Sequence, residues 1–91
     1  MNDLELQAFI GSRIREARQA RGYRQKELAK RLGLAKSTIC RYEDGQRVMS
    51  VGLVIQIAKT LGCPLDFLIG NDQEREAFVS HKLPWQKEGE V

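Results

Sequence analysis

The sequence predicts an all-α domain of five short helices, followed by a sixth short helix toward the C-terminus. Apolar residues recur three and four positions apart, which is the spacing of one face of an α-helix. Glycines stand where these repeats stop, and glycine is favoured just after the last helical turn. The chain has 91 residues, which suits one domain with little room for a second core.

The first predicted helix runs from Leu4 to about Arg21 and ends at Gly22. We expect Asp3 at its N-cap or in its first turn, where a carboxylate is favourable. Phe9 lies beside the apolar stripe of this helix. The stripe consists of Leu6, Ile10, Ile14 and Ala17.

The stretch 25–43 predicts two short helices joined by a tight turn. Gly33 ends the first of them, because glycine adopts a left-handed conformation without steric penalty. The second helix runs from Ala35 or Lys36 to Glu43 and buries Ile39 and Tyr42. Its opposite side carries mainly hydrogen-bond donors: Lys36, Ser37, Cys40 and Arg41. A helix with one anchored face and one donor face can be held by a scaffold and laid into the major groove of DNA.

The remainder of the core is predicted to come from two more helices. Ser50 is a good N-cap for a fourth helix over 51–61. Pro64 opens a fifth helix over 64–69, and Gly70 closes it. We expect the apolar residues of the fifth helix in the core or at an interface.

Residues 71–91 are predicted to form a C-terminal extension, either helical or dimerising, to a domain of residues 1–70. A sixth helix is expected over 72–81, with Pro84 ending it. Trp85 either docks on the domain or takes part in dimerisation.

Charge is unevenly distributed along the chain. The net charge is +3, but residues 13–47 hold eleven Lys/Arg against four Asp/Glu, a net of +7. Residues 66–91 hold three Lys/Arg against six Asp/Glu, a net of −3. A basic segment followed by an acidic tail indicates a polyanionic partner at one end only, whereas the alternative is a pair of solvated helix faces.

The residue types offer little for catalysis or metal binding. Cys40 and Cys63 are too few for a disulfide scaffold, and with His81 they cannot complete a tetrahedral zinc site. A Gly-rich phosphate loop and a carboxylate cluster are absent from the sequence, and Ser37 has no visible base. We therefore expect no enzymatic activity, no cofactor and no metal.

Cys63 is interpreted as a core or cap residue. Cys40 is either a residue at the rim of a DNA groove, which we favour, or a redox-sensitive thiol.

The segment ELAKRLGLAKSTICRYEDGQR resembles the helix-turn-helix of the lambda-repressor and Cro (XRE-like) family of phage and bacterial regulators. The similarity extends from about Arg13 to Gly70. It implies a compact five-helix, lambda-repressor-like DNA-binding domain. The matching features are Gln25 at the helix start, the Leu28-Ala29 pair, Gly33 in the turn, Ile39 inward, and Tyr42-Glu43 before Asp44-Gly45.

The resemblance also assigns roles to three residues outside the donor side of the third helix. It implies a structural ion pair between Arg18 and Glu43, which would orient one helix against another. For Gln25 it favours contact with a DNA phosphate, with helix capping as a compatible second role.

The same resemblance places DNA contacts on and around the third helix. Lys36, Ser37 and Arg41 are expected to reach base edges, because Arg and Lys donate to guanine O6 and N7 and Ser can meet a base. The loop after the helix departs from the family pattern, since Val48, Met49 and Ser50 replace the common basic residue and proline. The expected phosphate contacts are Gln25, Arg24, Lys26, Thr38, Gln46 and Arg47.

The sequence thus predicts a cytoplasmic, sequence-specific transcriptional regulator, most simply a repressor. It would bind double-stranded DNA as a homodimer on a palindromic operator, without a membrane segment. An alternative is an antitoxin-type DNA-binding protein whose C-terminal segment binds a protein partner. A tail that becomes ordered only with that partner would distinguish the second hypothesis.

Overall fold

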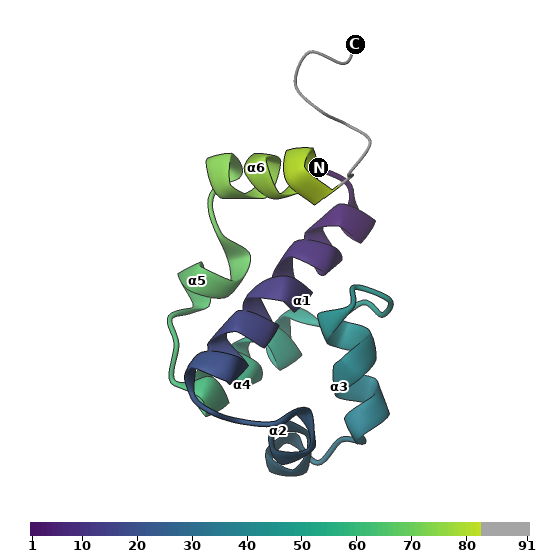
Figure 1. Ribbon diagram of the computed structural model, residues 1–91, viewed down its shortest axis with the longest axis vertical. Coiled ribbons are helices and arrows are strands. Elements are labelled where there is room, and N and C mark those ends of the chain that lie inside the picture. Colours follow the sequence, from purple (N-terminus) through teal and green to yellow (C-terminus); the bar gives the residue numbers. More distant parts are fainter. Residues whose placement is uncertain (83–91) are drawn as a thin grey trace.

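The computed structural model describes residues 1–82, with the side chains of residues 1–80, and all regular structure in this part of the chain is α-helical (Figure 1). The all-α expectation is therefore confirmed for these residues. The helices are α1 (Asp3–Ala20), α2 (Gln25–Leu32), α3 (Lys36–Glu43), α4 (Val51–Leu61), α5 (Leu65–Ile69) and α6 (Asp72–Lys82).

Helix α1 begins with a capping box at Asn2, one residue before Asp3, the residue expected at the N-cap or in the first turn. Asn2, not Asp3, is the N-cap: its Oδ1 accepts from the Glu5 backbone at 2.8 Å, and Glu5 accepts from the Asn2 backbone at 3.0 Å. This capping box satisfies two N–H groups that the first turn leaves without helical partners. Asp3 lies in the first turn, which was the other expected place for it.

The two short helices of the 25–43 stretch have the predicted bounds. Gly33 follows α2 with φ 70°, and its left-handed conformation lets the Leu34 backbone N–H donate back to Ala29 O at 2.9 Å. Leu34 is half-buried against the core. The turn therefore closes tightly enough to place α3 against α2.

Helix α4 has its predicted bounds, and α5 and α6 each differ from expectation by one residue. Ser50 caps α4, accepting from the Leu53 backbone at 3.1 Å. Pro64 is the N-cap of α5 and not its first helical residue, with an extended ψ of 143°. The sixth helix runs one residue further than predicted, to Lys82. The predicted roles of Pro84 and Trp85 fall outside the described residues.

The core forms around α1, which contacts α3, α4, α5 and α6. Phe9, Ile10, Ile14 and Ala17 of α1 are buried as predicted, and Leu6 is half-buried at one end. The other helices add buried residues from their inward faces: Leu28, Ala29, Ile39, Tyr42, Val54, Ile57, Ala58, Leu61 and Leu68.

The loop between α3 and α4 is held by a residue that the sequence analysis noted only as a departure from the family pattern. Met49 is buried, and its backbone N–H donates to the buried Gln7 Oε1 at 2.9 Å. The loop is thus anchored to α1 without the proline common in the family.

Helix α6 packs on α1. Phe78 meets Phe9 edge to face, with ring centroids 5.5 Å apart. Arg13 Nη2 lies 2.6 Å from Glu74 Oε2, and the Arg13 guanidinium also sits over the Phe9 and Phe67 rings. The Asn71 backbone N–H, together with Arg13, lowers the pKa of the Glu74 carboxyl below its ordinary value. The expected boundary between residues 1–70 and 71–91 stays a prediction.

Helices α1 and α3 approach closely at Gly11. A Cβ at this position would lie 2.2 Å from Tyr42 O and 2.7 Å from Glu43 O, so even alanine would collide with backbone. A second close approach occurs where Gly45, with φ 74°, faces the backbone of Ala8. These contacts fix how near α1 lies to the end of α3.

We predict that Gly11→Ala destabilises the protein by about 1–3 kcal/mol, the usual cost of overpacking, despite the better helix propensity of alanine. Gly52→Ala is the matched control, since Gly52 lies in α4 and a methyl group added there would meet nothing within 4 Å. It should stabilise by about 0.4–1 kcal/mol. Urea unfolding measures both, and equal effects of the two substitutions would contradict the close approach.

Candidate nucleic-acid interface

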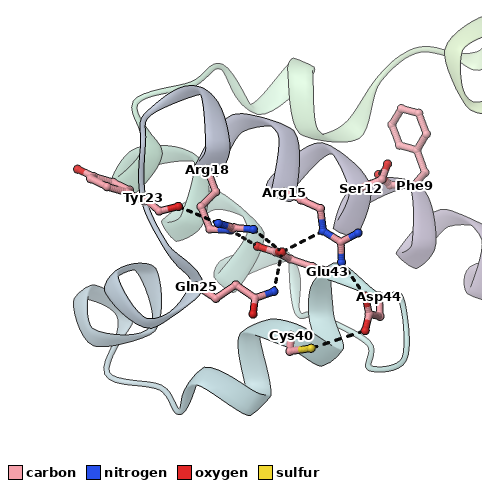
Figure 2. Close-up of polar contacts among 9 residues, drawn as sticks. All are labelled: Phe9, Ser12, Arg15, Arg18, Tyr23, Gln25, Cys40, Glu43 and Asp44. Atoms are coloured by element: carbon pink, nitrogen blue, oxygen red, sulfur yellow. Dashed lines mark hydrogen bonds and ion pairs between the residues drawn. The ribbon is translucent and has the colours of Figure 1, made fainter.

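The carboxylate of Glu43 is buried at the last turn of α3 and joins three helices (Figure 2). Arg18 of α1 binds it with two N–H groups, Nε to Oε2 at 2.6 Å and Nη2 to Oε1 at 3.0 Å. Gln25 Nε2, at the start of α2, donates to Oε1 at 3.0 Å. Arg18 Nη1 also donates to Tyr23 O at 2.7 Å, which ties down the link before α2. The pair expected from the resemblance therefore lies at the centre of a larger network.

Arg15 extends this network to the surface, which the sequence analysis missed. Its Nε donates to Glu43 Oε1 at 3.2 Å and its Nη2 to Asp44 Oδ1 at 2.6 Å. The hydrogen bond to Asp44 is the main cause that raises the pKa of Arg15, and the hydrogen bond to Glu43 is the second. The signal was present in the sequence, because Arg15 and Arg18 stand three residues apart and so share one side of a helix.

Cys40 lies beside this network on the half-buried side of α3. Its Sγ is 3.6 Å from Asp44 Oδ2, so the thiol can donate to an exposed carboxylate (Figure 2). Cys63 is also half-buried and packs against the core, and burial raises the pKa of its thiol. The position of Cys63 agrees with its interpretation as a core residue.

The outward side of α3 forms a face of exposed donors, here called the donor face, made of Lys36, Ser37 and Arg41. Within residues 1–80, neither Lys36 nor Arg41 forms an ion pair. The first turn of α3 has no acidic residue, and no side chain caps it. Its N-terminus, which carries a partial positive charge, is thus left beside a lysine.

The remaining predicted contact residues lie at the borders of this face. Arg24 and Lys26 are exposed at the start of α2, and Gln46 and Arg47 are exposed in the loop after α3. Arg47 stands over the Tyr42 ring with its guanidinium carbon 5.8 Å from the centroid. Thr38 is half-buried.

Gln25 has a partner that neither sequence interpretation included. Its amide nitrogen is held by Glu43, and it makes no cap contact to its own helix; the Arg24 backbone N–H instead donates to Glu27 at 2.8 Å. An amide nitrogen carries two hydrogens, so one remains after the bond to Glu43.

Two groups of cations can be distinguished in the described part of the chain. Arg13, Arg15 and Arg18 have carboxylate partners on other helices. Arg75 pairs with Asp72 of its own helix and donates to the Ile69 and Gly70 carbonyls at the end of α5. The cations on the donor face and its borders have no carboxylate partner there. Such unpaired cations, presented by a firmly seated helix, suit a polyanion such as the DNA backbone.

None of the helices described in residues 1–82 combines the length and hydropathy needed to cross a membrane.

Comparison with protein families gives a match to the helix-turn-helix family over residues 14–68, more than half of the chain. A transcriptional regulator of Rhodospirillum rubrum, encoded in the ATPase CF(0) region, is 37% identical over 68 residues, which cover 75% of this chain and 62% of the relative. The HTH-type transcriptional regulator ImmR of Bacillus subtilis is 31% identical over 64 residues, covering 70% and 50%. An HTH-type transcriptional regulator of Sinorhizobium fredii is 34% identical over 68 residues, covering 75% and 90%. The chain thus spans between half and two thirds of the first two relatives.

Solved structures agree with the fold. The DNA-binding domain of BldD superposes with a TM-score of 0.68 at 21% identity, covering 77% of this chain and 100% of the domain. The hypothetical transcription factor NHTF from Neisseria superposes with a TM-score of 0.69 at 24% identity, covering 86% and 90%.

We predict that Glu43→Gln destabilises the protein by about 3–5 kcal/mol, because it leaves the buried Arg18 guanidinium without its counter-charge. Asp44→Asn is the matched control, since Asp44 is exposed and pairs with the outer part of Arg15. It should cost about 1 kcal/mol or less. Urea unfolding at neutral pH gives both free energies. A loss for Glu43→Gln as small as that for Asp44→Asn would show that the buried pair does not hold the helices together.

Proposed function

The chain belongs to the helix-turn-helix family of DNA-binding transcriptional regulators, and from this premise we propose that it binds a palindromic operator as a homodimer, with α3 in the major groove. Two subunits related by two-fold symmetry would present two copies of α3 to half-sites about one helical turn apart.

The observation that carries this proposal is the division of α3 into two faces. On one side, Glu43 and the buried Ile39 and Tyr42 seat the helix against α1 and α2. On the other side, Lys36, Ser37 and Arg41 are exposed. A recognition helix needs both properties, because base readout depends on holding donors at a defined angle to the groove.

The proposed base contacts follow from the chemistry of the donor face. Arg41 offers two parallel N–H groups that match guanine O6 and N7, and Lys36 can donate to the same acceptors. Ser37, in the first turn, is short enough to allow close approach to a base or a phosphate. These three residues would set sequence preference.

The proposed phosphate contacts surround the base-reading residues. Arg24 and Lys26 stand at the start of α2, where free backbone N–H groups favour an anion. Gln25 can donate its second amide hydrogen to a phosphate while Glu43 holds the first. Thr38, Gln46 and Arg47 would complete the set from α3 and its following loop. Such contacts give affinity that falls steeply with salt.

We infer that the regulator acts as a repressor. Occupation of an operator is sufficient to exclude polymerase from an overlapping promoter, whereas activation needs an additional surface that contacts polymerase.

Selection of bound duplexes from a randomised DNA pool tests the proposal as a whole. We expect enrichment of an inverted repeat whose half-site centres lie about 10–10.5 base pairs, or a multiple of this, apart. Enrichment of a single half-site would contradict the dimer. Binding without any enrichment would contradict sequence-specific regulation.

Two substitutions separate base contacts from phosphate contacts on the selected operator. Arg41→Ala should reduce discrimination at one position of each half-site by about 1–3 kcal/mol, whereas Lys26→Ala should weaken all sequences alike and lower the salt slope by about 1 per subunit. Lys59→Ala, which removes an exposed lysine from the last turn of α4, is the control for charge alone. Titrations at several salt concentrations measure these effects. If Arg41→Ala resembles Lys59→Ala, Arg41 does not read a base.

A further inference from the structure

An apolar groove lies between α1, α4 and α5. These three helices contact one another, and Figure 1 shows how they are arranged. Its volume is about 170 Å³. Apolar side chains from all three helices and from the loop before α4 line most of it: Leu6, Ile10, Met49, Val51, Leu65 and Ile69.

The rim of this groove carries more exposed apolar surface than the fold requires. Val51 is 76% exposed and Ile69 is 36% exposed, although both line the groove. Covering the apolar surface of a concave site is favourable, because the surface is then removed from water. The groove therefore suits an apolar occupant.

The chain itself continues beside this groove. Val79 and Ser80, near the end of α6, line a depression together with Met1 and Glu5 at the start of α1. Leu6, the next residue of α1, lines the apolar groove. Nine residues follow Lys82, and an extended segment of that length reaches about 30 Å. The segment 83–91 is thus attached close to the groove and long enough to enter it.

The composition of this segment matches the groove. It begins Leu83-Pro84-Trp85, and Trp85 is the only tryptophan of the chain. An apolar cavity of about 150 Å³ is known to accept benzene, so a groove of this size can accept an aromatic ring. The other aromatic residues already have partners in the fold: Phe9, Phe67 and Phe78 around Arg13 and α6, Tyr23 under Arg31, and Tyr42 under Arg47.

We propose that the groove between α1, α4 and α5 is the docking site for the C-terminal segment of the same chain, with Trp85 inserted against Val51 and Ile69. Proline before the tryptophan restricts the backbone and lowers the entropy lost on docking. The docked segment would attach the C-terminus to the helix-turn-helix core and cover an apolar surface that is otherwise open to a second molecule. This inference goes beyond the proposed DNA-binding function and does not depend on it.

Fluorescence of the single tryptophan tests the proposal on the full chain in the absence of DNA. Relative to a synthetic peptide of residues 83–91, the protein should emit at shorter wavelength and be quenched less by acrylamide, at all protein concentrations. Val51→Asp should return both properties to those of the peptide. Val48→Asp is the matched control, because Val48 is similarly exposed, at 64%, and does not line the groove; it should change neither property.

Both valines are exposed, so neither substitution should impair folding, and circular dichroism checks this. Ile69→Asn provides a second groove variant with the same expected loss of protection. Emission equal to that of the peptide would overturn the proposal. Equal responses to Val51→Asp and Val48→Asp would place Trp85 elsewhere and overturn it too. Protection that disappears on dilution would overturn docking within one chain and indicate that a second copy covers the tryptophan.

Discussion

The position of α3 depends on one buried carboxylate, that of Glu43. It accepts hydrogen bonds from Arg18 and Arg15 of α1 and from Gln25 at the start of α2 (Figure 2). A buried charge is tolerable only when its partners are complete, so the three helices can assemble in essentially one relative arrangement. Because Glu43 belongs to the same short helix as Lys36 and Arg41, the contact that seats α3 also sets the direction in which these donors project.

The charged residues have two different roles in this structure. The acidic residues near α1 neutralise arginines that connect helices, as Glu43 does for Arg18 and Glu74 for Arg13. The cations of the donor face and its borders are left without carboxylate partners in residues 1–80, so a chain with a net charge of only +3 presents one strongly basic side. Helix α6, which begins with acidic residues, lies at the other end of the molecule from α2 (Figure 1). Such asymmetry favours one orientation of approach to a polyanion.

Backbone packing adds a second constraint on the same helix. Gly11 allows α1 to approach the carbonyl groups at the end of α3, and Met49 together with Gln7 holds the loop that follows. The family pattern commonly has a proline in that loop, whereas this chain uses a buried side chain and an amide hydrogen bond. In this chain the loop after α3 is therefore attached to α1 through the Met49–Gln7 hydrogen bond.

The helices, their faces and the family could be predicted from the sequence, because these depend on local interactions and on spacings within a few residues. Gly33, Ser50 and the donor residues of α3 are examples. The resemblance also supplied the Arg18–Glu43 pair. Two features could not be predicted in this way: Gln25 and Arg15 share Glu43, and Gly11 meets the end of α3. These contacts join residues 18 to 32 positions apart, and whether they meet depends on the angle and distance at which helices cross, which periodicity along one chain does not specify.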